Sequence, residues 1–258
     1  MHTFKKSLGQ HFLQDENICR KIVAALQEDE FLNLIEVGPG GGALTKYLLQ
    51  VEHINFKAVE LDAEKVEFLI KAYPKINDRI LNRSFLDIEK PFNSSFAIVG
   101  NFPYNISTQI LFKILEWKED VTCMVGMFQK EVAQRVASTE GSKVYGVLSV
   151  LVQAFFTVEY LFEVHENCFK PPPNVKSAVI RLRPLQHKPA IRSERAFFVL
   201  VKTAFNQRRK MLRNGVKSLF DSETLTMDIF RRRAEDLGVE EFAALTFKML
   251  QADPLKKA

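Results

Sequence analysis

Cysteine is scarce in this sequence, and long apolar runs are absent. The three cysteines among 258 residues, Cys19, Cys123 and Cys168, are far apart and form no CxxC pair. That pattern argues against a disulfide framework and against a zinc site, so no metal is expected. No apolar stretch approaches the ~20 residues that cross a bilayer, and the first residues lead into no signal-peptide-like segment. These absences predict a cytoplasmic protein with no membrane partner.

Acidic residues are also scarce, but only near the carboxy-terminus. Residues 1–180 carry 19 Lys and Arg against 22 Asp and Glu, whereas residues 181–258 carry 17 against 9. Between Arg195 and Phe220 there are seven basic residues and no acidic one. A solvated helical face is the alternative interpretation, but such a face usually mixes both signs. The basic tail therefore favours phosphate, as in a nucleic acid, as its partner.

The first 180 residues alternate short β-rich runs with helical patterns, which is typical of a mostly parallel sheet with crossover helices. The segment before the last run, His165–Lys176, is proline-rich and too short for a helical crossover. We therefore expect the last two strands to form an antiparallel hairpin. The expected strands are Leu32–Val37, Ile54–Leu61, Arg79–Leu86, Phe96–Asn101, Thr122–Phe128, Val158–Val164 and Ser177–Arg183.

A change of pattern marks a second domain. The segment Pro184–Pro189 resembles a linker, and only helical patterns follow it. The prediction is an α/β domain at 1–185, with a Rossmann-like seven-stranded sheet that matches the common class I methyltransferase sheet, and a small, basic all-helical domain at 186–258. The expected carboxy-terminal helices are Glu194–Phe205, Lys210–Phe220 and Glu240–Leu250.

Polar or glycine residues end three successive predicted strands. The turn Gly38–Gly42 leaves a strand and enters a helical pattern, Glu60 closes the second strand, and Asp87 closes the third. Glycines let the backbone approach a ligand, and a carboxylate at this spacing can accept both hydroxyls of a ribose. The spacing is G-x-G-x-G rather than the dinucleotide fingerprint, which disfavours a nicotinamide enzyme. A tight strand-to-helix turn without a ligand is the alternative for the glycines alone.

The tetrapeptide Asn101-Phe102-Pro103-Tyr104 follows the fourth strand. The Asn101 side-chain oxygen and the Phe102 carbonyl can accept the two hydrogens of an exocyclic amine, and Pro103 stiffens the turn that aims them. Tyr104 can stack on a base and face the cationic nitrogen that forms on methyl transfer. This motif after a glycine turn predicts methyl transfer to the amine of adenine.

Together, six motifs of the chain resemble the small-subunit (16S-type) ribosomal RNA adenine dimethyltransferases, nearly end to end. The resemblance implies S-adenosylmethionine as the methyl donor. It also implies dimethylation of two adjacent adenosines near the 3′ end of 16S rRNA within an immature small ribosomal subunit. The motifs are Lys5–Leu13, Glu36–Thr45, Asn101–Ser107, Gln129–Val132, Pro171–Ser177 and Phe205–Lys210.

The resemblance also assigns residues. His11 stands where the family more often has Asn, and Phe102 stands where it more often has Leu. A histidine can still donate one hydrogen bond to the methyl donor, and an exposed histidine is the alternative interpretation. The catalytic residues are Asn101, Phe102, Pro103 and Tyr104. The donor-binding residues are His11, Leu13, Gly38, Gly40, Glu60, Asp87 and Asn101. The expected RNA-binding residues are Lys5, Lys6, Arg208, Arg209, Lys210 and Arg213.

Two other functions remain open from the sequence. The related enzymes that dimethylate one adenosine of large-subunit RNA and confer macrolide resistance share the glycine turn and the Asn-x-Pro-Tyr site, although the basic helical tail looks more like the small-subunit type. An assembly checkpoint factor that acts mainly by binding immature particles is a second alternative. A monomer is the expected oligomeric state.

Overall fold

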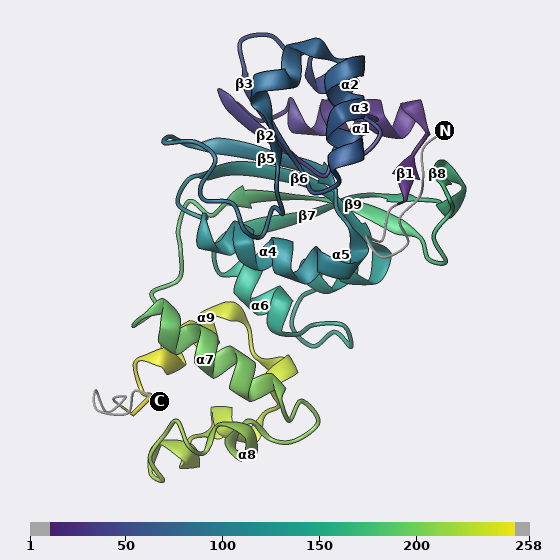
Figure 1. The fold of residues 1–258 in the computed structure, drawn as a ribbon. Coiled ribbons are helices and arrows are strands. Elements are labelled where there is room, and N and C mark those ends of the chain that lie inside the picture. Colours follow the sequence, from purple (N-terminus) through teal and green to yellow (C-terminus); the bar gives the residue numbers. More distant parts are fainter. Residues whose placement is uncertain (1–10, 251–258) are drawn as a thin grey trace. The chain divides into compact units, whose positions relative to one another are not determined.

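A seven-stranded sheet organises the first part of the chain in the computed structural model, which describes residues 11–250 (Figure 1). The strand order is β4-β3-β2-β5-β6-β9-β7; the first five of these are parallel, and β9 is antiparallel to both of its neighbours. The sheet and its closing antiparallel hairpin confirm the predicted fold class. The strands are β2 (Asn33–Val37), β3 (Asn55–Glu60), β4 (Ile80–Asn82), β5 (Phe96–Asn101), β6 (Val121–Gln129), β7 (Phe156–Val164) and β9 (Ser177–Pro184).

One small pairing has no counterpart in the sequence prediction. Strand β1 (Phe12–Leu13) pairs antiparallel with β8 (Phe169–Lys170), although more than 150 residues separate them. Two residues are too few to show a period of two, so the sequence pattern gives no sign of either strand. The pairing holds the chain near residue 12 close to the segment that precedes β9.

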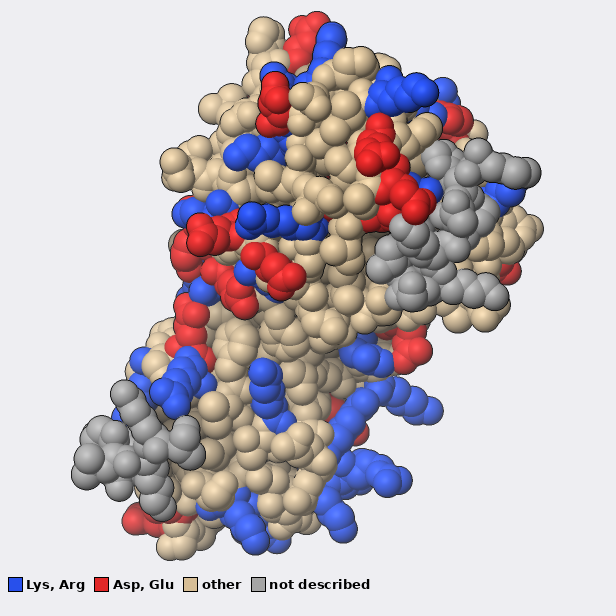
Figure 2. All heavy atoms as spheres, in the orientation of Figure 1, with Lys and Arg blue, Asp and Glu red and all other residues tan. Residues whose placement is uncertain are grey.

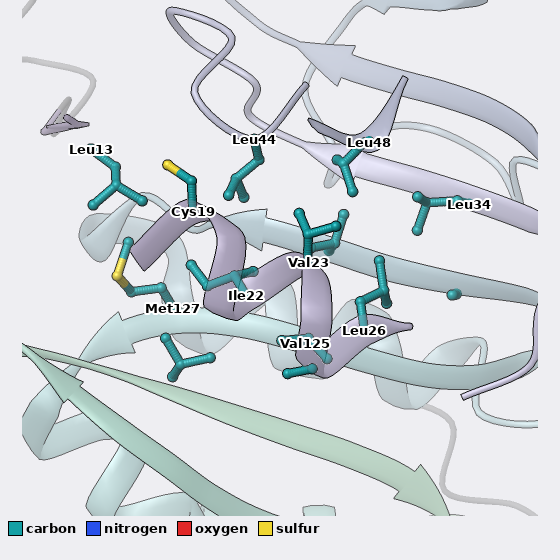
Figure 3. Packing of buried hydrophobic residues seen from close by; sticks show 14 of the residues in the cluster. Leu13, Cys19, Ile22, Val23, Leu26, Leu34, Leu44, Leu48, Val125 and Met127 are labelled. Atoms are coloured by element: carbon teal, nitrogen blue, oxygen red, sulfur yellow. The ribbon is translucent and has the colours of Figure 1, made fainter. Parts of the chain in front are cut away.

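Helices cover both faces of the sheet. In Figure 1, α1 (Glu16–Leu26), α2 (Thr45–Leu48) and α3 (Ala63–Ala72) lie on one face, and α4 (Ser107–Glu116) and α5 (Lys130–Ala137) lie on the other. Helix α1 begins at Asp15, whose side chain accepts hydrogen bonds from two backbone N–H groups of its first turn. Its buried residues recur every three or four positions, as an amphipathic helix requires. Figure 3 shows this apolar stripe packed over β2 and β6; the residues it labels are Leu13, Cys19, Ile22, Val23, Leu26, Leu34, Leu44, Leu48, Val125 and Met127.

The strand order reverses at β2: the strands after β2 are added first on one side of it and then on the other. Strand β3 lies on one side of β2, and β5 lies on the other. In open α/β sheets, ligands bind at the carboxyl ends of the strands at such a switch point. The glycine turn follows β2, and Asn101 ends β5, so both are placed where the fold class predicts a site.

The carboxy-terminal helices, together with Ser138–Phe155, form a compact unit with a core of its own, which we call the helical unit. Its helices are α6 (Val147–Gln153), α7 (Glu194–Phe205), α8 (Leu212–Val216) and α9 (Val239–Thr246). Phe197, Phe230 and Phe242 are fully buried, and the Tyr145 hydroxyl donates to the Leu237 carbonyl at 3.0 Å. Helix α8 is shorter than the expected Lys210–Phe220; Asn214 and Gly215 lower its helix propensity.

The two units divide the chain discontinuously. One comprises residues 11–137 and Phe156–Pro184, and the other comprises Ser138–Phe155 and residues 185–250. The second boundary lies within one residue of the 185/186 boundary expected from the linker. Ser138–Phe155 falls within the predicted first domain, whereas in the structure this segment packs with the carboxy-terminal helices.

Candidate active site

A pocket of about 400 Å³ opens at the carboxyl ends of β2, β3 and β5. Each of these strand ends contributes residues to its wall, and β1, the start of α1 and the segment after β4 also line it. The pocket therefore lies at the switch point of the sheet. Of the residues predicted from the sequence, its lining contains His11, Leu13, Gly38, Gly40, Glu60, Asn101, Phe102, Pro103 and Tyr104.

The glycine turn brings bare backbone to this pocket. Gly38, Gly40 and Gly42 have positive φ angles of 67°, 54° and 82°. Residues other than glycine rarely adopt this backbone region. A Cβ atom on Gly40 would lie 2.9 Å from the ring of Phe12. The glycine at this position therefore permits both the turn and the close approach of β1.

Glu60 ties the turn to the end of β3. Its carboxylate accepts hydrogen bonds from the Gly40 N–H at 3.0 Å and from the Asp62 N–H at 2.9 Å. Burial raises the pKa of Glu60 above its usual value, although these two hydrogen bonds oppose the shift. The result is a carboxylate at the pocket wall whose position is fixed by backbone.

A second carboxyl group of the pocket, Glu36, was missed by the sequence analysis. It precedes the glycine turn on β2, is 1% exposed, and accepts a hydrogen bond from the Thr45 hydroxyl at 2.7 Å. Burial raises the pKa of Glu36 to about 8, opposed by the Thr45 hydrogen bond and assisted by the nearby charge of Glu60. Glu36 is therefore predominantly protonated at neutral pH. The sequence signal was available, because an acidic residue in an otherwise apolar strand is unusual.

The Asn101 side chain is held by the backbone of residue 11. Its Nδ2 donates a hydrogen bond to the His11 carbonyl oxygen at 2.9 Å. This contact fixes the orientation of the amide and leaves Oδ1 as the acceptor. Within residues 11–250, no described group donates to Oδ1. The pocket thus contains an oriented side-chain acceptor at the end of β5.

His11 also contacts Tyr104. Their rings are stacked, with centroids 5.5 Å apart and planes inclined by 28°. The His11 Nδ1 is 2.9 Å from the Pro171 carbonyl oxygen and so carries the proton of that hydrogen bond. The Tyr104 hydroxyl is 2.5 Å from the Ser177 Oγ, and burial raises the pKa of Tyr104. His11 therefore contacts both principal residues of the Asn-x-Pro-Tyr motif.

The side chain of Phe102 is buried in the protein interior rather than exposed at the mouth of the pocket. Its ring is 1% exposed and lies 4.9 Å, between centroids, from the ring of Phe128. Its N–H donates to the Met127 carbonyl on β6 at 3.1 Å. A Cβ atom on Gly126 would lie 2.2 Å from this ring, so the glycine there makes room for it. The ring anchors the turn that presents the Phe102 backbone.

The structure does not bring Asp87 to the pocket. Strand β4 ends at Asn82, and Asp87 lies five residues further on with its side chain exposed and outside the pocket lining. Ser84, Phe85 and Leu86 line the pocket from this segment instead. The prediction extended the third strand to Leu86, and that longer strand would have put Asp87 at its end.

Of the predicted basic residues, four lie within the described part of the chain; Lys5 and Lys6 lie outside it. The Arg208 guanidinium is ion-paired with Glu235 and donates to the Ser142 carbonyl at 3.1 Å. Arg209, Lys210 and Arg213 are exposed, and none of their side chains has a described partner. Figure 2 shows blue side chains gathered over the helical unit on the face drawn. Arg208 thus has a structural role in this unit, whereas the other three extend into solvent.

Neither a metal cluster nor a membrane-spanning helix is found within residues 11–250. No cluster of three or more His, Cys, Asp and Glu side chains in this range is arranged to hold a metal ion. None of its helices has the length and apolar character needed to span a membrane.

Among solved structures, this fold is similar to that of a dimethyladenosine transferase from Plasmodium falciparum. The TM-score is 0.76 at 22% identity, covering 90% of this chain and 94% of that one. The 23S rRNA methyltransferase ErmE gives a TM-score of 0.67 at 22% identity, covering 90% and 99%. At such identities the likeness shows the fold alone, which is that of a methyltransferase.

Sequence comparison is more specific. The ribosomal RNA small subunit methyltransferase A of Flavobacterium johnsoniae is 50% identical over 253 residues, covering 96% of each chain. The protein of the same name from Cytophaga hutchinsonii is 48% identical over 247 residues, covering 94% of this chain and 95% of its own. The family model described as ribosomal RNA adenine dimethylase matches residues 1–249. The chain belongs to the ribosomal RNA adenine dimethylase family.

Proposed function

We propose that the protein dimethylates two adjacent adenosines near the 3′ end of 16S rRNA in the immature small ribosomal subunit, with S-adenosylmethionine as the donor. The observation that carries this proposal is the oriented Asn101 amide, which lines the same pocket as Tyr104 at the switch point of the sheet. Relatives of 43–50% identity that bear the small-subunit name favour this substrate over large-subunit RNA. The reaction would then take place in the cytoplasm, where these particles assemble.

The pocket fits the donor in both size and chemistry. Its volume of about 400 Å³ is within the range of small-molecule sites. The Gly38–Gly42 turn offers bare backbone to the methionine portion, and Glu60 offers a buried carboxylate to the ribose hydroxyls. Ser84, Phe85 and Leu86, which line the pocket in place of Asp87, would contact the adenine ring of the donor. The bound donor supplies an electrophilic methyl group on a sulfonium, whose leaving group is a neutral thioether.

The chain's own residues orient the target amine. The adenine amino group is a poor nucleophile because its lone pair is delocalised into the ring. Hydrogen bonds to the Asn101 Oδ1 and to the Phe102 carbonyl hold its two hydrogens, so the lone pair points out of the base plane. The pocket needs no general base, because the proton can leave to water after transfer. Positioning and electrostatics therefore account for the rate.

The target base stacks on the aromatic ring of Tyr104. His11 covers one side of its ring, which leaves the opposite side for stacking. The electron-rich face stabilises the cationic nitrogen that forms as the methyl group arrives. The target base reaches this position by leaving its stack, at a cost of a few kcal/mol that is smaller in a flexible loop.

RNA is held through phosphate by the exposed cations of the helical unit. Arg209, Lys210 and Arg213 extend into solvent without described partners. Contacts of this kind position the substrate without reading its sequence.

The direct test is to incubate the protein with S-adenosylmethionine and undermethylated small subunits, and to identify the modified nucleosides by mass spectrometry. Dimethyladenosine at two neighbouring positions is the expected product. Asn101→Ala should lower the rate at least a hundredfold, by analogy with removal of one transition-state hydrogen bond, while donor affinity is partly retained. The exposed Asn93→Ala is the matched control. Dimethyladenosine at a single large-subunit position, or full activity of Asn101→Ala, would refute the assignment.

A further inference from the structure

A second hollow of about 310 Å³ lies at the carboxyl end of β6, outside the pocket described above. We call it the flanking groove. It is formed by the end of β6, the first turns of α5 and the segment that leads into β9. Its lining consists of Gln129, Lys130, Glu131, Gln134, Val175 and Lys176.

The flanking groove adjoins the proposed base site. Lys176 precedes Ser177, whose hydroxyl contacts the Tyr104 hydroxyl at 2.5 Å. On the sheet, Asn101 of β5 pairs with Met127 of β6. Gln129 lies two residues beyond Met127 on β6, roughly 7 Å from Met127 at the rise of a β-strand. The Lys130 N–H donates to the Lys176 carbonyl at 2.9 Å and so holds the two sides of the groove together.

The side chains of this groove suit a nucleotide. The side-chain amides of Gln129 and Gln134 have no described hydrogen-bond partner within residues 11–250. Paired donor and acceptor atoms of a glutamine match the N6 and N7 atoms of adenine. Val175 is 45% exposed and offers an apolar surface to a base.

The charges of the groove favour a phosphate at its edge. Lys130 is ion-paired with Glu163 at 2.6 Å, and Glu131 is paired with Arg135 at 2.7 Å. Lys176 is exposed and has no described ion-pair partner. The hydrogen bond from Lys130 lowers the pKa of Glu163, and the nearby charge of Lys176 adds a smaller contribution in the same direction. One positive charge is therefore left uncompensated at the rim.

We propose that the flanking groove binds the adenosine next to the one being methylated and reads its base through Gln129 or Gln134. This inference rests on the proposed function, because it assumes a substrate with two adjacent adenosines. Lys176 contacts the phosphate that joins the two nucleotides, and Val175 contacts the face of the flanking base. The protein then recognises a pair of adenosines rather than a single one.

The test compares small subunits whose RNA carries either both adenosines or a guanosine in place of one of them. Guanine presents an acceptor where adenine presents its amine. Wild-type protein should therefore methylate the remaining adenosine about tenfold more slowly when the replaced neighbour is the one that enters the groove. Replacement on the other side should have a smaller effect. The double variant Gln129→Ala/Gln134→Ala should be slow on both particles, with a rate ratio near one.

The matched control is Gln27→Ala, an exposed glutamine at the end of α1. It should retain the tenfold preference, and every protein in the comparison should bind S-adenosylmethionine with the wild-type affinity. A double variant that keeps the wild-type preference would overturn the inference while the proposed function stands. A wild-type protein that forms no dimethyladenosine on the natural particle would instead overturn the proposed function, and the inference with it.

Discussion

At the scale of single residues, His11 links the parts of the candidate active site. Its carbonyl oxygen accepts from Asn101, its ring stacks on Tyr104, and its Nδ1 donates to the Pro171 carbonyl. From the sequence, His11 is a predicted donor-binding residue, and it lines the pocket. Its ring also lies against Tyr104, one of the residues that would orient the target base.

Substitutions at His11 should therefore change turnover more than donor affinity. Asparagine can keep a short donor near Nδ1 and hence the Pro171 hydrogen bond, but it cannot stack on Tyr104. We expect His11→Asn to lose at most a few-fold in kcat and His11→Ala about tenfold, a loss of about 1.4 kcal/mol in transition-state stabilisation. Kinetics with undermethylated small subunits, together with calorimetric binding of S-adenosylmethionine, measure both quantities. A large loss of donor affinity with unchanged kcat would contradict this expectation and support a donor-binding role for His11.

The buried carboxyl group of Glu36 predicts a pH dependence of stability. Its pKa of about 8 exceeds the ordinary 4.5, so between these values the folded chain holds a proton that the unfolded chain has released. The contribution of Glu36 to the free energy of unfolding is complete below pH 4.5 and is lost as the pH rises toward 8. The loss is at most about 5 kcal/mol at ~1.4 kcal/mol per pKa unit.

The variant Glu36→Gln keeps an acceptor for Thr45 but cannot ionise. Urea unfolding at pH 5 and pH 9 should show a smaller decline in the free energy of unfolding for this variant than for the wild type. Parallel declines in the two proteins would show that Glu36 does not titrate in this range.

At the scale of elements, the short strand β1 passes directly over the glycine turn. A Cβ atom on Gly40 would meet the Phe12 ring at 2.9 Å, whereas one on Gly141, which also has positive φ, meets nothing within 4 Å. Gly40→Ala and Gly141→Ala should each lose about 1–2 kcal/mol of stability from the backbone conformation alone. Only Gly40→Ala should also displace Phe12 and weaken donor binding.

Thermal unfolding and S-adenosylmethionine titration of these two variants separate the effects. Equal donor affinities in the two variants would mean that β1 does not constrain the turn.

The alternation of strands and helices predicted the sheet because six of its seven strands are five to nine residues long. It also located Gly38, Glu60 and Asn101, since each directly follows or ends a strand whose boundary was predicted within one residue. Asp87 shows the limit of this reasoning. The apolar residues Phe85 and Leu86 extend the pattern of β4, but they pack from a turn rather than from a strand. Strand β1 was beyond prediction, because its partner is distant in the sequence.

At the scale of the whole molecule, the two units have different chemistry. The described site residues of the first unit surround a pocket, whereas the cations Arg209, Lys210 and Arg213 lie exposed in the second. Composition predicted a basic carboxy-terminal part. It could not distinguish the ion-paired Arg208 from the exposed cations around it, because the ion pair with Glu235 depends on tertiary structure.

Charge reversal in the second unit should weaken particle binding without affecting the donor. For Arg209→Glu/Lys210→Glu we expect the slope of log K against log salt concentration to become shallower by about 2, near one unit for each lost phosphate contact. The control Lys71→Glu/Lys75→Glu makes the same change in net charge on exposed residues of the first unit. Filter binding of small subunits from low to moderate salt measures both variants. If the two slopes change equally, net charge rather than this surface governs binding; if only the first slope changes, the RNA contacts the helical unit at these residues.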